Sequence, residues 1–176
     1  MKTKALGIIL AFCFLAAAAC FAADPQMGTW RLNEAKSKFA PGRPKNTTVV
    51  YRDATGGKVK ITTDGVDANG KATHSEWTGK FDGKGYPVTG DPTSDMRSYT
   101  KLDDRTMDFT VKKGGKTTVT GRIVVAGNGK SRTVTTSGTT GTAAPAGRAW
   151  QRGDFLAEQK GQKGKNFKNI AVFDKQ

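Results

Sequence analysis

The sequence has few of the side chains on which nucleophilic and metal-dependent catalysis usually rests. Its 176 residues include two cysteines and one histidine, and both cysteines, Cys13 and Cys20, lie close to the N-terminus. The remainder therefore cannot form a Cys–His nucleophile or a zinc site with several histidine ligands. We expect a protein that is not an enzyme and that uses neither a metal nor a cofactor.

The single histidine, His74, does not by itself indicate a catalytic site. Ser75 and several aspartates could supply the other members of a Ser-His-Asp arrangement, but no nucleophile elbow accompanies them. In an extended strand His74 shares a face with Glu76 and opposes Trp77. We therefore expect His74 to face solvent beside Glu76.

The sequence that starts at Asp64 also does not form a complete calcium-binding loop. Asp64, Asp67 and Asn69 offer oxygen ligands, but the twelfth position counted from Asp64 is Ser75, and the twelfth from Asp67 is Thr78. Such a loop needs a bidentate carboxylate at its end. An Asn-Gly hairpin turn at Asn69 accounts for these residues instead.

The one long apolar run lies near the N-terminus, at residues 5–19. Its ~15 residues fall short of the ~20 that a transmembrane helix needs. Lys2 and Lys4 precede the run, and Cys20 and Ala22 place small side chains at the −3 and −1 sites of a cleavage point after Ala22. We predict a signal peptide at 1–22 and a periplasmic or secreted mature chain without a transmembrane segment. Because residues 17–20 loosely resemble a lipobox that lacks its usual leucine, lipoprotein anchoring at Cys20 is an alternative.

Removal of residues 1–22 would leave 154 residues (176 − 22) without cysteine and with a net charge of +12 (14 − 2). That length supports a single domain, 23–176, held together by burial without disulfides. The positive charge would attract anionic polymers or an anionic envelope surface. The lysines are spread along the chain, however, and the aromatic residues follow the apolar strand pattern. We therefore expect no nucleic acid partner.

The sequence does contain a regular series of short predicted β-strands. In residues 105–138, threonine, valine and isoleucine alternate with polar residues, and Gly114-Gly115 and Asn128-Gly129 supply hairpin turns. No helical pattern alternates with the strands. The pattern predicts an all-β fold, an antiparallel up-and-down meander. The predicted strands are 47–53, 57–65, 71–81, 95–102, 105–113, 116–126 and 130–138.

The segments around these strands complete the prediction. A helical turn capped by Asn33 follows residues 28–32, and residues 82–95 form a long connection. Residues 139–167 read as a flexible basic insert, with a short helix capped by Asp154. A last strand at 167–173 would pair with the first and close a barrel of eight to ten strands.

Residues 28–30, Gly-Thr-Trp, precede a helical turn and an antiparallel meander and so resemble the N-terminal G-x-W signature of lipocalin-like (calycin) β-barrels. Residues 28–39 and 166–175 are also similar to a group of small uncharacterised exported bacterial proteins, although the insert at 139–167 is long for that group. The lipocalin resemblance implies that Trp30 packs at the closed end of the barrel against an arginine from a late strand. Arg132 is the best match for that arginine.

A barrel of this size is wide enough either to be filled by side chains or to hold one small ligand. We predict that a small apolar or amphipathic molecule binds inside. The alternative is a solid core in a basic envelope-associated protein whose surface binds anionic polymers or a protein partner. Gly121 leaves a gap on the inward face. A ligand in that gap would support the ligand-binding prediction, and a neighbouring side chain in it would support the solid core. The predicted ligand-binding residues are Trp30, Tyr51, Ile61, Trp77, Phe81, Met107, Phe109, Val119 and Ile123, with Val59, Thr63, Thr117 and Val134 on the same face.

Overall fold

The computed structural model describes residues 24–140 and 165–176, which form ten β-strands and one short 3-10 helix, η1. The prediction of an all-β fold is confirmed. The elements are β1 (Gly28–Leu32), η1 (Glu34–Lys36), β2 (Lys45–Ala54), β3 (Lys58–Val66), β4 (Ala72–Gly79), β5 (Tyr86–Thr89), β6 (Met96–Lys101), β7 (Thr106–Lys113), β8 (Lys116–Val125), β9 (Ser131–Thr140) and β10 (Lys165–Lys175).

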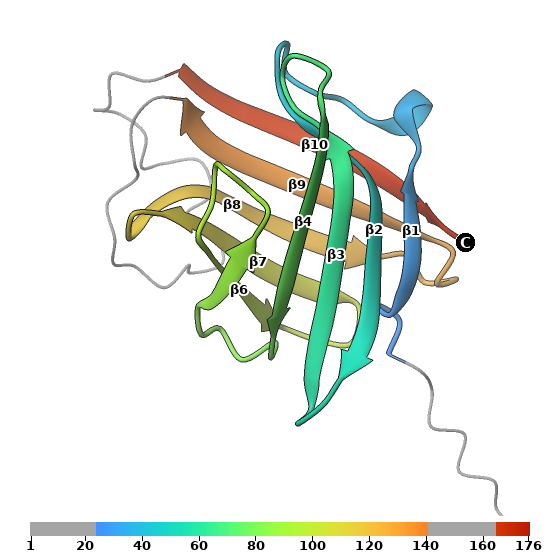
Figure 1. The fold of residues 1–176 in the computed structure, drawn as a ribbon. Coiled ribbons are helices and arrows are strands. Elements are labelled where there is room, and N and C mark those ends of the chain that lie inside the picture. The colour runs from blue at the N-terminus through green and yellow to red at the C-terminus, as the bar shows by residue number, and fades with distance from the viewer. Residues whose placement is uncertain (1–23, 141–164) are drawn as a thin grey trace, which may run out of the picture.

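The strands form one closed antiparallel barrel in which chain neighbours are also sheet neighbours (Figure 1). Strand β1 closes the sheet by pairing with β2 on one side and with β10 on the other. Across the second seam Trp30 lies opposite Lys175, and Leu32 lies opposite Phe173. The predicted pairing of the last strand with the first is therefore confirmed, and it leaves these ten strands without an unpaired sheet edge.

The alternation of side chains decides which face of each strand is inside. In β3, Ile61, Thr63 and Gly65 are buried, and the residues between them are more exposed. This is the period-2 pattern of a half-buried strand. The β7–β8 hairpin turns at Gly114 and Gly115, whose φ angles of 56° and 75° lie in the left-handed region that glycine tolerates best. Local sequence thus sets both the strand faces and the turn.

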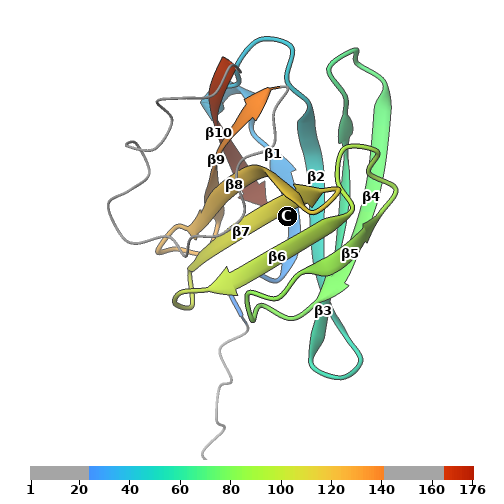
Figure 2. The ribbon, with the colours of Figure 1, turned by 90° about the vertical axis from the view of Figure 1, so that its left-hand side faces the viewer.

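The connection predicted at residues 82–95 contains a strand that the sequence pattern did not reveal. Strand β5 lies between β4 and β6 and pairs with each of them through two residue pairs (Figure 2). Its four residues include Pro87, which cannot donate a backbone hydrogen bond to a neighbouring strand. A strand this short, interrupted by proline, has too few alternating residues to be recognised, so the prediction of an unstructured connection is wrong here.

Strands β9 and β10 extend further than predicted, to Thr140 and from Lys165, and so take the outer residues of the predicted insert. The rest of that insert, including the helix predicted at Asp154, lies outside the described residues. The predicted signal peptide at 1–22 also lies outside them. In the ranges that are described, no helix is long and apolar enough to cross a membrane.

The helical turn after β1 forms as predicted. The side chain of Asn33 accepts a hydrogen bond from the backbone N–H of Lys36 at 3.1 Å, which caps η1. Beyond η1 the chain runs beside β10, where Lys38 forms an isolated bridge with Ile170. This segment therefore continues the pairing along β10 beyond the end of β1.

The N-terminal residues close one end of the barrel, which we call the base. Gln26 is fully buried, and its Nε2 donates to the carbonyl oxygen of Arg105 at 3.0 Å. The indole Nε1 of Trp30 donates to the carbonyl oxygen of Gln26 at 2.9 Å. Lys101 forms an ion pair with Asp24 at 2.9 Å. The opposite end, with the connections 33–44, 67–71 and 90–95, is called the rim.

Candidate functional site

Most of the predicted interior residues meet in one buried core. Phe81 and Phe109 are half-buried and pack against this core, as do Val59 and Val134. Val119 is half-buried and is not part of it. The inward direction of these strands is thus confirmed for most positions, and ligand binding by any of them stays a prediction. The fully buried members of the predicted set are Trp30, Tyr51, Ile61, Trp77, Met107 and Ile123.

The gap at Gly121 is filled by a neighbouring side chain. Gly121 on β8 lies directly opposite Phe109 on β7, and a Cβ atom at Gly121 would collide with the Phe109 ring. Gly138 on β9 has the same relationship with the ring of Phe167 on β10. Both glycines therefore give an aromatic ring room against the barrel wall. At the level of Gly121 the interior is packed by protein.

Aromatic rings form one wall of the interior, from β4 to β7. Trp77 stacks on Phe81 with a centroid distance of 6.2 Å, and Tyr86 and Tyr99 meet it edge-on at 5.7 and 4.8 Å. Tyr99 also contacts Phe109 at 5.8 Å. Offset and edge-on pairs of this kind add about 0.5–1.5 kcal/mol each beyond the burial of their area. This wall is therefore rigid and apolar.

A buried arginine occupies the opposite side of the interior. Arg132 on β9 is 2% exposed. Its guanidinium carbon lies 4.7 Å from the ring centroid of Trp30, 4.8 Å from that of Tyr51 and 5.1 Å from that of Phe173. The expectation that Arg132 packs against Trp30, which came from the lipocalin resemblance, is confirmed. Cation–π contacts with three rings offset part of the cost of burying this charge.

The hydrogen-bonding capacity of Arg132 is only partly used. Its Nε and Nη1 atoms are buried and find no hydrogen-bond partner among the described residues, and no carboxylate in those ranges forms an ion pair with it. Burial lowers the pKa of Arg132, and the nearby Tyr51 opposes that shift. A buried charge of this kind is normally paired, so these two nitrogens call for a physical explanation.

A second arginine, Arg97 on β6, also points inward, and the sequence analysis missed it. Its side chain is 13% exposed, and its Nη2 lies 3.5 Å from Oδ2 of Asp91, which is a long contact for an ion pair. Its buried Nε has no partner in the described part of the chain. Burial lowers the pKa of Arg97, but Tyr99, Asp91 and Tyr51 outweigh that effect, and the pKa lies above its usual value.

Two inward tyrosines, Tyr51 and Tyr99, interact electrostatically with these arginines. Burial raises the pKa of Tyr51 to about 12, although Arg132 acts in the opposite direction. Tyr51 and Tyr99 each influence the pKa of both arginines, and the guanidinium carbon of Arg132 lies 4.8 Å from the ring centroid of Tyr51. We call Arg97, Arg132, Tyr51 and Tyr99 the arginine–tyrosine cluster. The cluster combines two positive charges with two hydroxyls in an otherwise aromatic interior.

Asp91, the carboxylate near the cluster, is already well supplied with donors. It accepts hydrogen bonds from the backbone N–H and hydroxyl of Thr93 at 2.8 and 2.7 Å and from the hydroxyl of Ser94 at 2.7 Å. Burial raises the pKa of Asp91, but these hydrogen bonds and Arg97 lower it by a larger amount. The pKa of Asp91 is therefore below its usual value. Asp91 therefore holds the loop 90–95 together and neutralises Arg97 only weakly.

The inward side chains of the rim half are mixed in size. Strand β3 places Thr63 inside, β4 places Ser75 and β9 places Thr136, of which Thr63 is buried and the other two are half-buried. The same half also holds the buried ring of Phe167, packed on Gly138, and the side chain of Arg97. The barrel thus has a base of large rings and a rim half in which hydroxyl-bearing groups lie beside one ring and one arginine.

His74 lies where the sequence placed it, on the outer face. Its Nε2 is 3.9 Å from Oε1 of Glu76, and its Nδ1 is 2.6 Å from Oδ1 of Asp64. Lys60 pairs with the same Glu76 at 2.7 Å, so the group forms an exposed charge network. No set of three or more His, Cys, Asp or Glu side chains within residues 24–140 and 165–176 is arranged to hold a metal ion.

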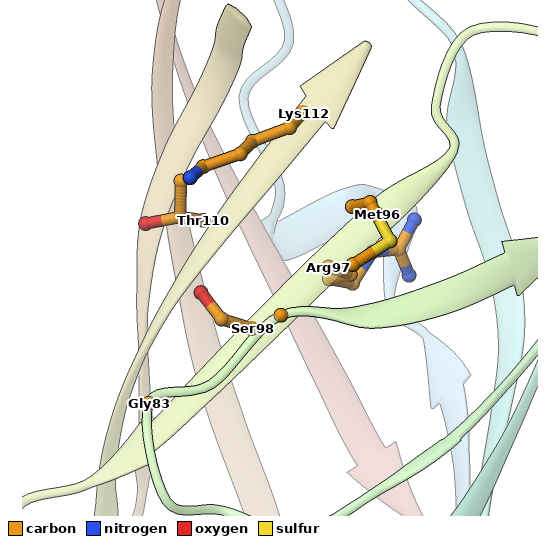
Figure 3. Close-up of a pocket in the computed structure, with 7 residues that line it drawn as sticks. Gly83, Met96, Arg97, Ser98, Thr110 and Lys112 are labelled. Carbon is orange, nitrogen blue, oxygen red and sulfur yellow. The ribbon is translucent and has the colours of Figure 1, made fainter. Parts of the chain in front are cut away.

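Two hollows are found on the outside of the barrel. The first, of about 50 Å³, lies over β6 and β7, where Figure 3 shows Ser98, Thr110 and Lys112 beside the chain at Gly83. The second, of about 310 Å³, lies over the outward residues Val50, Arg52, Lys60, Thr62 and Glu76. Ligand pockets usually enclose ~300–1,000 Å³ with mostly apolar walls. The first hollow is too small for a lipid-sized molecule, and the second has several charged side chains in its lining.

Comparisons with known proteins do not assign the chain to a family. No family model and no curated protein matches it. Among solved structures it is similar to one described as EF1p2_mFAP2b bound to DFHBI, with a TM-score of 0.42 and 13% sequence identity over 88% of this chain and 97% of that chain. A likeness at this level carries no argument about function. What the structure defines is a closed ten-stranded antiparallel β-barrel.

Proposed function

We propose that this protein is an exported, non-enzymatic, lipocalin-like barrel that reversibly binds one small amphipathic molecule in its interior. The observation that carries the proposal is the difference in the inward side chains between base and rim. Large rings such as Trp30 and Trp77 fill the base, whereas Thr63, Ser75 and Thr136 line part of the rim half beside Phe167 and Arg97. A molecule that enters from the rim would meet these hydroxyl-bearing side chains before the aromatic core.

The packed ring of Phe109 at Gly121 limits how deep such a molecule can lie. The ligand would occupy the rim half, and its inner end would approach Arg97 and the ring of Tyr99, which lies opposite Phe109. An apolar wall with few polar groups is typical of small-molecule sites. The long rim connections, including the loop 90–95, would have to admit the ligand.

A matched pair of variants tests the location. Thr136 points inward and its neighbour Thr135 points outward on β9, because Thr136 lies opposite Gly121 and Thr135 lies opposite Arg122. Thr136→Phe should fill the rim half and abolish binding of a fatty-acid and dye panel measured by native mass spectrometry, whereas Thr135→Phe should leave binding unchanged. Absence of binding by the unmodified protein to any member of the panel would refute the proposal.

Export is a separate part of the proposal. It rests on the basic start, the apolar run at 5–19 and the small residues around Ala22. Mass spectrometry of the protein from the periplasm or the medium should give a chain that begins at Ala23. A lipid-modified Cys20 at the N-terminus would instead support membrane anchoring, and a retained residue 1 would contradict processing.

The second candidate is binding of an anionic polymer by the outer surface. One observation favours it, namely the basic tip of the β7–β8 hairpin, where Lys113 and Lys116 are exposed beside the Gly114–Gly115 turn. Charge reversal at both positions should then reduce salt-sensitive retention on an anionic matrix more than reversal at the distant Lys58. Equal retention of the two variants would remove this candidate.

A further inference from the structure

We infer that the hollow on the outer face of β2, β3 and β4 binds a small phosphate monoester, with its phosphate held by Arg52, Lys60 and Thr62. The inference rests on the hollow of about 310 Å³ over these residues and on the register of the three strands, which lie side by side in Figure 1. It is independent of the proposed function, because the site lies outside the barrel and needs no ligand inside it.

The strand register places the side chains of the hollow in two neighbouring rows across the sheet. In one row Val50, Thr62 and Glu76 lie opposite one another on β2, β3 and β4. In the next row toward the base, Arg52 lies opposite Lys60. The short side chains of Val50 and Thr62 thus lie between longer charged ones, and together these residues line the hollow. Val50 offers an apolar surface to the body of a ligand.

The pairing of Arg52 with Lys60 is unfavourable within the protein itself. Like charges directly opposite each other on neighbouring strands repel and destabilise a sheet. Lys60 pairs with Oε1 of Glu76 at 2.7 Å, whereas Arg52 is exposed and forms none of the ion pairs found in the described ranges. Proteins tend to break such local rules at functional sites. An anion between the two cations would replace their repulsion by two attractions.

The donors of the hollow match a phosphate group. A guanidinium such as that of Arg52 presents N–H groups in a fork that fits phosphate oxygens, and the ammonium of Lys60 adds a flexible point charge. The hydroxyl of Thr62 is a third donor on the same lining. A phosphate monoester carries about −1.5 to −2 charge at pH 7 and three strong acceptor oxygens. Both its charge and its oxygens therefore suit two cations and one hydroxyl.

The carboxylates near the hollow already have partners. Besides Lys60, Glu76 has Nε2 of His74 at 3.9 Å, and Asp64 on the rim side has Nδ1 of His74 at 2.6 Å. Their negative charge is therefore partly offset. Glu76 would still compete with a phosphate for Lys60, so its removal should strengthen binding.

The experiment titrates the unmodified protein with glycerol phosphate, inorganic phosphate and glycerol, followed by methyl-resolved NMR. Glycerol phosphate should give saturable shifts at the outward Val50 and Thr62 and none at the inward Val49 and Thr63. Inorganic phosphate should bind more weakly, because it has no body to contact Val50. Glycerol should not bind detectably.

Variants then place the phosphate. Arg52→Met and Lys60→Met should each weaken glycerol phosphate binding about tenfold or more, because each removes a hydrogen bond to a charged group. Glu76→Gln should strengthen it several-fold. Lys130→Met removes one positive charge from the exposed β8–β9 turn and should leave the affinity unchanged.

Three results would overturn the inference. The first is the absence of saturable shifts at Val50 and Thr62 with glycerol phosphate. The second is an equal loss of affinity in Arg52→Met and Lys130→Met, because binding would then follow only the net charge of the protein. The third is equal affinity for inorganic phosphate and glycerol phosphate, which would contradict a site for a monoester. None of these results bears on binding inside the barrel, so the proposed function would stand or fall separately.

Discussion

The ring of Phe109 occupies the space that Gly121 leaves on the inner wall of the barrel. The two residues lie directly opposite each other on β7 and β8. Their relationship shows that a glycine in an inward strand position can serve packing within the protein and need not indicate a ligand cavity. Space for a ligand must be sought nearer the rim, where the inward residues are small.

Replacement of Gly121 by alanine should destabilise the protein. The added Cβ would collide with the ring of Phe109 and with the carbonyl oxygen of Thr135, which cannot move away without distorting β9. We expect a loss of about 1–3 kcal/mol in the free energy of unfolding, as for other over-packed cores. Chemical denaturation measures it. Gly127→Ala is a suitable control, because its nearest neighbour is 3.7 Å away at the flexible end of Arg105, and a similar loss there would contradict the packing explanation.

Arg132→Met should show how much the buried arginine contributes to stability. Methionine has a similar length and would lie among Trp30, Tyr51 and Phe173 without a buried charge. Replacing a poorly paired buried charge by an apolar side chain is often neutral or stabilising, so the unfolding free energy should fall by no more than about 1 kcal/mol in chemical denaturation. A large loss of stability would instead mean that the cation–π contacts stabilise the fold.

The carboxylate of Asp91 should contribute stability that depends on pH. Its pKa is lowered in the folded protein by Thr93, Ser94 and Arg97, so its contribution is present above the ordinary pKa of about 4 and is lost as the pH falls through the folded value. Asp91→Asn should therefore lower the unfolding free energy near neutral pH and have little effect in strong acid. A parallel series with the exposed Asp53→Asn should show no such difference. A pH-independent effect at Asp91 would contradict this explanation.

Tyr51 should resist ionisation at alkaline pH. Its folded pKa of about 12 lies above the usual ~10 for a tyrosine, so the stability it contributes is present below pH ~10 and is lost between ~10 and ~12. Ultraviolet titration of the phenol absorbance should show a tyrosine that ionises near pH 12 and that is absent in Tyr51→Phe. Titration of all tyrosines near pH ~10 in the folded protein would show that Tyr51 is reached by solvent.

Strand alternation was sufficient to predict most of the fold. Strands rich in threonine, valine and isoleucine, with alternating faces and glycine turns between them, located β2 to β4 and β6 to β9 and the inward faces of Ile61 and Trp77. The pairing of Arg132 with Trp30 followed from the G-x-W resemblance. Strand β5 could not be predicted, because its four residues make only two pairs with each neighbour and include a proline.

The arginine–tyrosine cluster was missed for a different reason. The sequence analysis placed Tyr51 inside the barrel and Arg132 against Trp30, but it assigned no inward residue to the strand at 95–102. Arg97 was therefore not considered, although its parity with Tyr99 in β6 already placed both on one face. The influence of Tyr51 on the pKa of Arg97 depends on closure of the barrel across strands that are far apart in the sheet order, which no local sequence pattern predicts.

The central claim, that a small amphipathic molecule binds inside the rim half, is tested most directly by methyl-resolved NMR during titration with decanoate. The inward methyl groups of Thr63 and Thr136 should shift in proportion to bound ligand, while the outward methyl groups of Thr62 and Thr135 should not. Shifts confined to the outward set, or no shifts at saturating ligand, would contradict the account.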